Sequence, residues 1–222
     1  MLGWFKKKNI AVLSPREGYD LWATTYSHES NPIKDLSNKF VESMLSDLKG
    51  KSVLDAGCGT GHFCMLAQKH QAKQIIGIDF SQVMIDQAKK NCPTAQFYCS
   101  DLSTFNLSQE PVDVMICALV IGHIENISPV FTNFSSMLKP GGYLILTDFH
   151  PILTLQNAKR TFKNPQTQEN IEITHYLHRL EEIKSLLESL GFRIEQIQEP
   201  QWKDVPVVYG LKAIKINHGS AA

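Results

Sequence analysis

Three glycines in the first half of the chain have the spacing of a ligand-binding turn. Gly57, Gly59 and Gly61 follow the apolar run SVLDAGC (52–58) and open a predicted helix. Because glycine has no Cβ, the backbone at these positions can approach a ligand closely, beside the free amides of a helix N-terminus. The spacing is G-x-G-x-G, and His62 occupies the place of the third glycine in the G-x-G-x-x-G turn of dinucleotide-binding proteins. The turn indicates a ligand site but does not by itself specify the ligand.

Three aspartates close the first three predicted strands. Asp55 stands two residues before Gly57, Asp79 ends the next strand 22 residues after Gly57, and Asp101 ends the third. An offset of about 20 residues places a carboxylate against the hydroxyls of a bound ribose. Any one of these acids could instead be a helix cap or a solvated loop carboxylate. Together with the glycine turn, the set indicates a ligand that contains a ribose.

Apolar runs alternate with helical periodicity through most of the chain, and these elements must position the glycines and acids. Strands are expected at 52–58, 74–80, 95–101, 112–120, 143–149, 192–198 and 209–216. Helices are expected at 33–49, through Phe63 and Ala67, after Ser81, at 127–139 and at about 177–190. The alternation is typical of an α/β fold with a doubly wound, seven-stranded, mostly parallel sheet that binds ligands at the carboxyl ends of its strands.

We expect one structural domain with two additions. Residues 1–32 would form an N-terminal helical cap, and residues 33–222 the domain that contains the sheet. After the fifth strand, residues 152–174 are polar and irregular, with a hairpin expected at KNPQTQ (163–168). An insertion of this length in a compact domain is more often a lid or a substrate wall than a plain connection.

Four motifs resemble those of class I S-adenosylmethionine (SAM)-dependent methyltransferases. LDAGCGTG, GIDFS, CSDL and LKPGGYLILTD occur in that family's order and spacing, and the resemblance covers about residues 50–216. The segment YDLWATTY (19–26) resembles the N-terminal helix of family members that act on small molecules. The resemblance implies a Rossmann-like fold, SAM as the methyl donor and S-adenosylhomocysteine as the product.

The resemblance also implies a cofactor site, residue by residue. Gly57, Cys58 and Gly59 would line the methionine part of SAM, with Gly61 in the same turn and Asp55 organising the amino end. Asp79 would accept both ribose hydroxyls, with Phe80 and Met84 against the adenine. Asp101 would accept from the adenine amino group, the Leu102 amide would meet the ring, and the Ala118 carbonyl would reach the methionyl ammonium. Tyr19 shares a helical face with Trp22 and Tyr26, and this stripe either caps the cofactor or packs in the core.

Methyl transfer to a hydroxyl also requires removal of a proton, and histidines are the candidate bases. His150 follows YLILTDF at the carboxyl end of the fifth strand, and Pro151 turns the chain into the insertion. We predict His150 as the catalytic residue that contacts the acceptor. The alternatives are His175 or His178 beside the last helix, and His123 just past the fourth strand, where a structural or cofactor-side role is expected.

Composition excludes several classes of protein. The chain of 222 residues has 22 Lys+Arg and 22 Asp+Glu, and its one dense basic cluster, Lys6–Lys8, reads as a solvated tail. This charge balance, and the lack of an Asn-Pro-Pro-Tyr-like motif after the fourth strand, argue against an adenine N6-methylase. The longest apolar run is shorter than the ~20 residues that a membrane span requires. Asp148 is the one obvious metal ligand near the fourth and fifth strands, so no metal is expected.

The sequence therefore predicts a SAM-dependent methyltransferase whose acceptor is a small molecule or a carrier-bound metabolite, with O-methylation favoured. Five cysteines without paired or metal-type spacing predict reduced thiols and a cytoplasmic location. We expect a monomer or homodimer with no membrane or nucleic-acid partner. Two alternatives remain open: a methyltransferase of tRNA or protein, and a non-catalytic SAM-binding scaffold or regulator.

Overall fold

Seven strands form the central sheet in the order β4-β3-β2-β5-β6-β12-β9. The computed structural model describes residues 10–29, 31–107 and 110–216, and the Lys6–Lys8 cluster lies outside these ranges. Each strand of the sheet overlaps one predicted from the sequence. The strands are β2 (Ser52–Ala56), β3 (Gln74–Asp79), β4 (Gln96–Cys99), β5 (Val112–Ala118), β6 (Leu138–Phe149), β9 (Phe192–Gln198) and β12 (Val208–Lys215).

The neighbouring strands from β4 to β6 are parallel, and β12 pairs antiparallel with both β6 and β9. Parallel strands covered on both faces require continuous apolar runs, and every residue of β2 is buried. The strand order reverses between β2 and β5, which leaves a crevice at their carboxyl ends. The predicted α/β fold with a doubly wound, mostly parallel seven-stranded sheet is confirmed.

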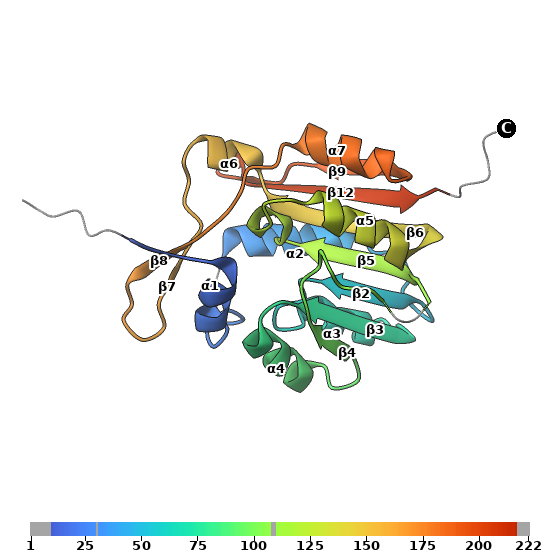
Figure 1. Cartoon of the computed structure of the whole chain (residues 1–222), viewed down its shortest axis with the longest axis horizontal. Coiled ribbons are helices and arrows are strands. Elements are labelled where there is room, and N and C mark those ends of the chain that lie inside the picture. The colour runs from blue at the N-terminus through green and yellow to red at the C-terminus, as the bar shows by residue number, and fades with distance from the viewer. Residues whose placement is uncertain (1–9, 30, 108–109, 217–222) are drawn as a thin grey trace, which may run out of the picture.

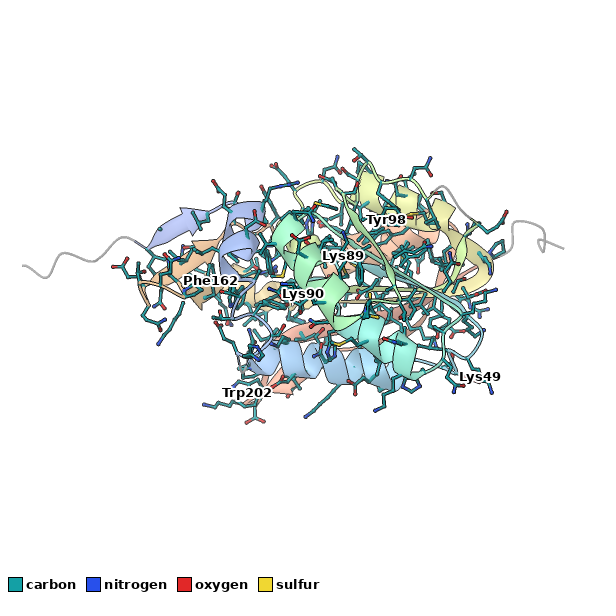
Figure 2. The ribbon with its side chains drawn as sticks, turned by 90° about the horizontal axis from the view of Figure 1, so that it is seen from below. Lys49, Lys89, Lys90, Tyr98, Phe162 and Trp202 are labelled. Carbon is teal, nitrogen blue, oxygen red and sulfur yellow. The ribbon has the colours of Figure 1, made fainter. Side chains whose placement is uncertain are left out.

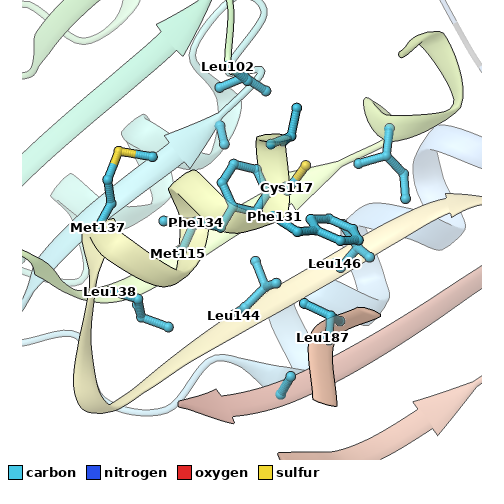
Figure 3. Close-up of a cluster of buried hydrophobic side chains, with 14 of the residues drawn as sticks. Leu102, Met115, Cys117, Phe131, Phe134, Met137, Leu138, Leu144, Leu146 and Leu187 are labelled. Atoms are coloured by element: carbon cyan, nitrogen blue, oxygen red, sulfur yellow. The ribbon is translucent and has the colours of Figure 1, made fainter. Parts of the chain in front are cut away.

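Helices cover both faces of this sheet (Figure 1). The helices α2 (Pro32–Met44), α3 (His62–Lys69) and α4 (Gln82–Asn91) contribute to one core cluster or border it, and α5 (Ser128–Met137) and α7 (Leu180–Ser189) contribute to the other. In the second cluster, Phe131 and Phe134 of α5 meet Leu144 and Leu146 of β6, with Leu187 of α7 beside them (Figure 3). These five side chains are fully buried. Burial of each stabilises the fold by roughly 1.5–3 kcal/mol, and the result is a firm base for the loops at the strand ends.

A second, three-stranded sheet lies beyond the carboxyl ends of the parallel strands (Figure 1). Its central strand, β8 (Asn170–Ile173), is antiparallel to β7 (Thr161–Lys163) and parallel to β1 (Ala11–Leu13). The β7–β8 hairpin turns where the sequence predicts it. The sequence does not predict β1, because three mostly exposed residues carry no strand signature and their partner lies far along the chain.

The helix α1 (Pro15–Trp22) lies against this small sheet. Its first turn is fixed by a capping box between Ser14 and Glu17. Trp22 stacks on Phe162 of β7, with ring centroids 4.8 Å apart. Figure 2 shows Phe162 among these elements at one end of the molecule. We call residues 10–29 and 152–174 together the cap.

The remaining elements are short. They are the 3₁₀ turn η1 (Ile121–His123), the helix α6 (Pro151–Leu155), and a two-stranded ribbon of β10 (Gln201–Trp202) and β11 (Val205–Pro206). Within the described ranges, no helix combines the length and the apolar character that crossing a bilayer demands.

Candidate active site

The turn between β2 and α3 is held in a conformation that requires glycine. Gly57 has φ +79°, and a Cβ built on it would lie 2.3 Å from Cγ2 of Val120. Gly61 has φ +86° and is the N-cap of α3. The amides of Gly57 and Cys58 both donate to the Ile78 carbonyl, at 2.7 and 2.8 Å. The turn is thus tied to β3 and presents backbone rather than side chains to the crevice.

Asp79, at the end of β3, is a buried carboxylate beside this turn. One of its oxygens accepts from the Gly59 amide and the other from the Ser81 amide, both at 2.9 Å. Burial raises the pKa of Asp79 to about 6, against the opposing effect of these two amides. The Ser81 hydroxyl accepts from the Met84 amide at the start of α4 and donates to Asp20 of α1. Donors from a ligand would stabilise the ionised form of Asp79.

A cavity of about 470 Å³ is built around the turn and Asp79; we call it the first cavity. Its walls come from the carboxyl ends of β2, β3 and β5, from the loop after β4, and from α1 with the turn that follows it. Its size is typical of a site for a small molecule or cofactor. The lining residues used in the following argument are Tyr19, Tyr26, Gly57, Gly59, Asp79, Phe80, Met84, Asp101, Leu102, Ala118, Leu119 and His123.

Tyr19 and His123 form a hydrogen-bonded pair on the wall of the first cavity. The Tyr19 hydroxyl lies 3.1 Å from Nε2 of His123, and Nδ1 of His123 lies 3.0 Å from the Thr174 carbonyl oxygen. A carbonyl only accepts, so Nδ1 carries the proton and Nε2 has the lone pair that accepts from Tyr19. Burial lowers the pKa of His123 to about 4, and the positive charge of Arg160 acts in the same direction. The imidazole is therefore neutral at neutral pH.

Leu119 marks the point where the chain leaves β5. Its φ of +60° is unfavourable for a residue with a side chain, and such strain concentrates at functional sites. Its amide donates to the Thr147 carbonyl at 2.8 Å, which fixes the bend against β6.

A second cavity, of about 140 Å³, shares part of its wall with the first. Tyr19, Tyr26, Leu119 and His123 line both cavities. The two cavities are therefore adjacent, and His123 is part of the wall between them. The rest of the wall is supplied by the cap, by the start of α2 and by the end of β6: Trp22, Glu29, Asn31, Ile33, Lys34, Phe149, Lys159, Arg160, Thr161 and Ile173.

A family model described as a methyltransferase domain matches residues 27–197. The chain belongs to the methyltransferase domain family. The class I SAM-dependent methyltransferase family that the motifs predict is thereby confirmed.

Two relatives of this methyltransferase are named O-methyltransferases. The ubiquinone biosynthesis O-methyltransferase of Coxiella burnetii (strain Dugway 5J108-111) is 27% identical over 179 residues, which cover 77% of this chain and 74% of the relative. The malonyl-[acyl-carrier protein] O-methyltransferase of Xylella fastidiosa (strain M23) is 30% identical over 135 residues, which cover 57% of this chain but only 45% of the relative. A putative SAM-dependent methyltransferase from Listeria monocytogenes has the same fold, with a TM-score of 0.71 at 21% identity over 82% of this chain and 99% of that one.

Most of the predicted cofactor residues of the methyltransferase lie on the first cavity. Asp55, Cys58 and Gly61 are not among its lining residues. Asp55 is only 2% exposed at the end of β2, where it accepts from the Cys64 thiol at 3.7 Å. Burial raises the pKa of Asp55 to about 7. The lining residues that the sequence predicts are Tyr19, Gly57, Gly59, Asp79, Phe80, Met84, Asp101, Leu102 and Ala118.

His150 lines neither cavity. It is the N-cap of α6, where its Nδ1 accepts from the Ile152 amide at 3.2 Å and its Nε2 lies 3.2 Å from a carboxylate oxygen of Glu199. Both ring nitrogens thus have partners in the protein. At the turn before Pro151 the imidazole caps α6, and contact of His150 with an acceptor stays a prediction.

The other two candidate histidines are also engaged elsewhere. His175 Nδ1 lies 3.3 Å from the Ile173 carbonyl oxygen, and His178 Nε2 lies 2.7 Å from that of Ile124. Of the four histidines considered from the sequence, only His123 is among the described residues that line the two cavities.

Sequence reasoning missed two parts of the site. Ser14, Pro15 and Arg16 line the first cavity from the start of α1, and the capping-box spacing of Ser14 and Glu17 was the available signal. Arg160 lines the second cavity from the insertion, where no periodicity marks it as buried.

The described part of the chain has no cluster of three His, Cys, Asp or Glu side chains placed as metal ligands. Asp148, the metal ligand considered from the sequence, accepts from the Gly122 amide at 2.7 Å and pairs with Arg160 at 3.2 Å. Independence from a metal stays a prediction.

Proposed function

We propose that this methyltransferase transfers the methyl group of SAM to a hydroxyl of a small molecule or a carrier-bound metabolite. The observation that carries the proposal is the position of His123, which lies on the wall common to both cavities. Its burial keeps it neutral, and its bond to Thr174 leaves the lone pair on Nε2, where Tyr19 donates. A neutral imidazole with this lone pair can accept a proton, and its lowered pKa makes it a weak base in the free protein.

The first cavity suits SAM in size and chemistry. Gly57 and Gly59 offer close approach to the backbone, and Asp79 offers a carboxylate to ribose hydroxyls. Phe80 and Met84 supply apolar surface for the adenine. When bound, SAM supplies a sulfonium whose methyl carbon is open to in-line attack.

Tyr19 and His123 are placed to take the proton of the acceptor. A hydroxyl in the second cavity can donate to the Tyr19 oxygen, whose own proton is already directed at Nε2 of His123. When the acceptor loses its proton, that proton passes to Tyr19 and the Tyr19 proton passes to His123. Burial raises the pKa of Tyr19 well above its usual value, so the phenol acts as a relay and not as a standing phenolate. General-base assistance of this kind contributes about 10²–10⁴-fold to a rate.

The size of the second cavity favours a small acceptor. About 140 Å³ holds a small molecule or the end of a carrier-bound group, but no folded macromolecule. The names of the two relatives support oxygen as the acceptor atom and include one carrier-bound substrate. The charge balance of 22 against 22 supports a metabolite over tRNA, and five free cysteines support a cytoplasmic location.

Transfer of tritiated methyl groups tests the proposal. The purified protein is incubated with methyl-tritiated SAM and a cell extract, and the products are separated by size. We expect label in the low-mass fraction, or on a small carrier from which mild base releases it, and loss of the label with His123→Gln. Label that stays in RNA or in protein side chains would support the first alternative. SAM binding without any transfer would support a scaffold or regulator.

A further inference from the structure

Arg160 is a buried arginine on the wall of the second cavity that leaves much of its hydrogen-bonding capacity unused. Its side chain is 7% exposed and lies over the Phe149 ring, with Cζ 4.0 Å from the ring centroid. Nη2 pairs with Oδ1 of Asp148 at 3.2 Å. Nε and Nη1 are buried and have no partner among the described residues. An unpaired charged donor costs stability in a protein interior, so a ligand that accepts from it gains affinity.

Asp148 holds this guanidinium in place without using its other donors. The carboxylate is nearly inaccessible and is already shared between backbone groups. Its Oδ2 accepts from the Gly122 amide at 2.7 Å, and its Oδ1 accepts from the Phe149 amide at 2.6 Å. Such a supported pair fixes the position of Arg160 and leaves Nε and Nη1 unpaired. Both nitrogens are covered in this structure, with the end of the guanidinium against Gly122, so a ligand of the second cavity reaches them when the covering groups move.

The other two cations on the second cavity have partners. Lys34 Nζ donates to the Tyr26 and Glu29 carbonyls at 2.9 and 3.0 Å. Lys159 Nζ donates to both carboxylate oxygens of Glu172 at 2.8 Å. Among the described cations that line the second cavity, Arg160 thus has the free donors. A guanidinium binds carboxylate and phosphate alike, but a single unpaired cation balances the one charge of a carboxylate and not the two charges of a phosphate dianion, which favours the carboxylate.

We propose that the acceptor of this methyltransferase carries a carboxylate, which Arg160 binds, and a separate hydroxyl, which reaches Tyr19 and His123. The inference rests on the proposed function and adds the substrate class: a small hydroxy acid, free or carrier-bound, with an apolar body between Trp22, Tyr26 and Phe149. The hydroxyl oxygen bonds to the methyl carbon as the sulfur–methyl bond of SAM breaks and S-adenosylhomocysteine is left. The hydroxyl proton passes to Tyr19 and the Tyr19 proton to His123, and the carboxylate is unchanged.

Chemical blocking of carboxylates in the small-molecule extract tests this class directly. One portion is treated with a water-soluble carbodiimide and methylamine, which convert carboxylates into amides, a second with alkaline phosphatase, and a third is left untreated. The untreated portion must accept tritiated methyl groups for the proposed function to stand. We expect amidation to abolish acceptance and phosphatase to leave it intact. Acceptance that survives amidation, or that phosphatase removes, would overturn the carboxylate assignment while leaving the methyltransferase assignment in place.

Substitution of Arg160 tests whether this residue binds the carboxylate of the acceptor. Arg160→Lys keeps the charge but loses the planar donors, and we expect the KM for the acceptor to rise about 10- to 100-fold, as for the loss of charge-assisted hydrogen bonds. The Kd for SAM should stay unchanged. Arg179→Lys is the matched control, because Arg179 is exposed and lies outside both cavities.

A double variant guards against a folding defect. Arg160→Gln with Asp148→Asn removes both charges of the buried pair together, so no uncompensated carboxylate is left in the interior. If this variant folds and binds SAM but loses the acidic acceptor, the assignment holds. An unchanged KM for the acceptor in the folded variants would overturn it.

Discussion

The phenolic oxygen of Tyr19 lies 3.1 Å from Nε2 of His123, although 104 positions separate the two residues. Tyr19 belongs to the cap, and His123 belongs to the loop after β5. Trp22, one turn after Tyr19, stacks on Phe162, and β1 pairs with β8. Because these contacts hold α1 and the adjoining β1 on the small sheet, the pair is complete only when the cap is assembled on the domain.

Removal of the imidazole should affect the chemical step and not cofactor binding. We expect His123→Gln to lower kcat by about 10²–10⁴-fold and Tyr19→Phe to lower it about tenfold or more, since each breaks the proton path. Affinity for SAM should change little with His123→Gln. Steady-state kinetics with the tritium assay measures kcat, and titration calorimetry measures the Kd.

His150→Gln is the matched control for that substitution. His150 caps α6 and contacts Glu199, so its replacement should lower the melting temperature slightly and leave kcat per folded molecule unchanged. If His150→Gln were slow and His123→Gln fast, the base would be His150, as the sequence predicts, and the proton path through Tyr19 would be refuted.

The carboxylate of Asp79 should make SAM binding depend on pH. Its pKa is raised to about 6 in the free protein, and ribose hydroxyls donate best to the ionised form. Binding then tightens as pH rises through that value, and the Kd should fall about tenfold between pH 5 and pH 7. Asp79→Asn should remove this dependence, and Asp79→Ala should weaken binding at pH 7 by about 2–4 kcal/mol. A Kd for SAM that is independent of pH in the wild type would contradict the ribose contact.

The rate itself should follow a different pH dependence. The pKa of His123 is lowered to about 4, so the imidazole is already neutral throughout the range from pH 6 to pH 8. With both substrates saturating, kcat should be flat over this range, while the KM for SAM falls as Asp79 ionises. A kcat that rises through pH 6.5 would point to a histidine with an ordinary pKa as the base.

Position 57 should require glycine mainly because a side chain there would clash with Val120, and only secondarily because of its positive φ. Gly57 and Gly141 have nearly equal φ values, +79° and +78°, but a Cβ on Gly141 meets nothing within 4 Å. Both Gly→Ala variants therefore carry the same left-handed strain of about 1–2 kcal/mol. Gly57→Ala should in addition displace Val120 and weaken SAM binding at least tenfold, as measured by calorimetry. Equal SAM affinity in the two variants would show that the close approach of Gly57 to Val120 is not needed for SAM binding.

The sequence predicts the parts of this site that depend on local pattern, and it misses those that depend on long-range packing. The apolar runs, the glycines and Asp79 are read from short windows; the runs form the predicted strands, and Gly57, Gly59 and Asp79 line the first cavity. The orientation of His150 is set by a capping bond from the nearby Ile152 amide and by Glu199. Glu199 lies 49 positions away, outside any short window around residue 150. In the same way, Arg160 becomes a buried cation only because Asp148 lies beneath it.

The cap should open and close as a unit around bound ligands. Its small core comprises Phe162, Ile171 and Ile173 with Tyr19 and Trp22 of α1, and β1 and β8 share only three register pairs. So small a sheet has low local stability, so its amides should exchange quickly in the free protein and become protected when SAM and acceptor fill the two cavities. Phe162→Ala removes the partner of Trp22 and should raise the exchange of β7, β8 and α1 together, while the amides of β2 and β5 keep their protection. Hydrogen exchange with mass spectrometry measures each segment. Equal protection of the cap with and without ligands, or loss of protection in β2 as well, would mean that the cap is a fixed part of the domain and that access to the second cavity has another route.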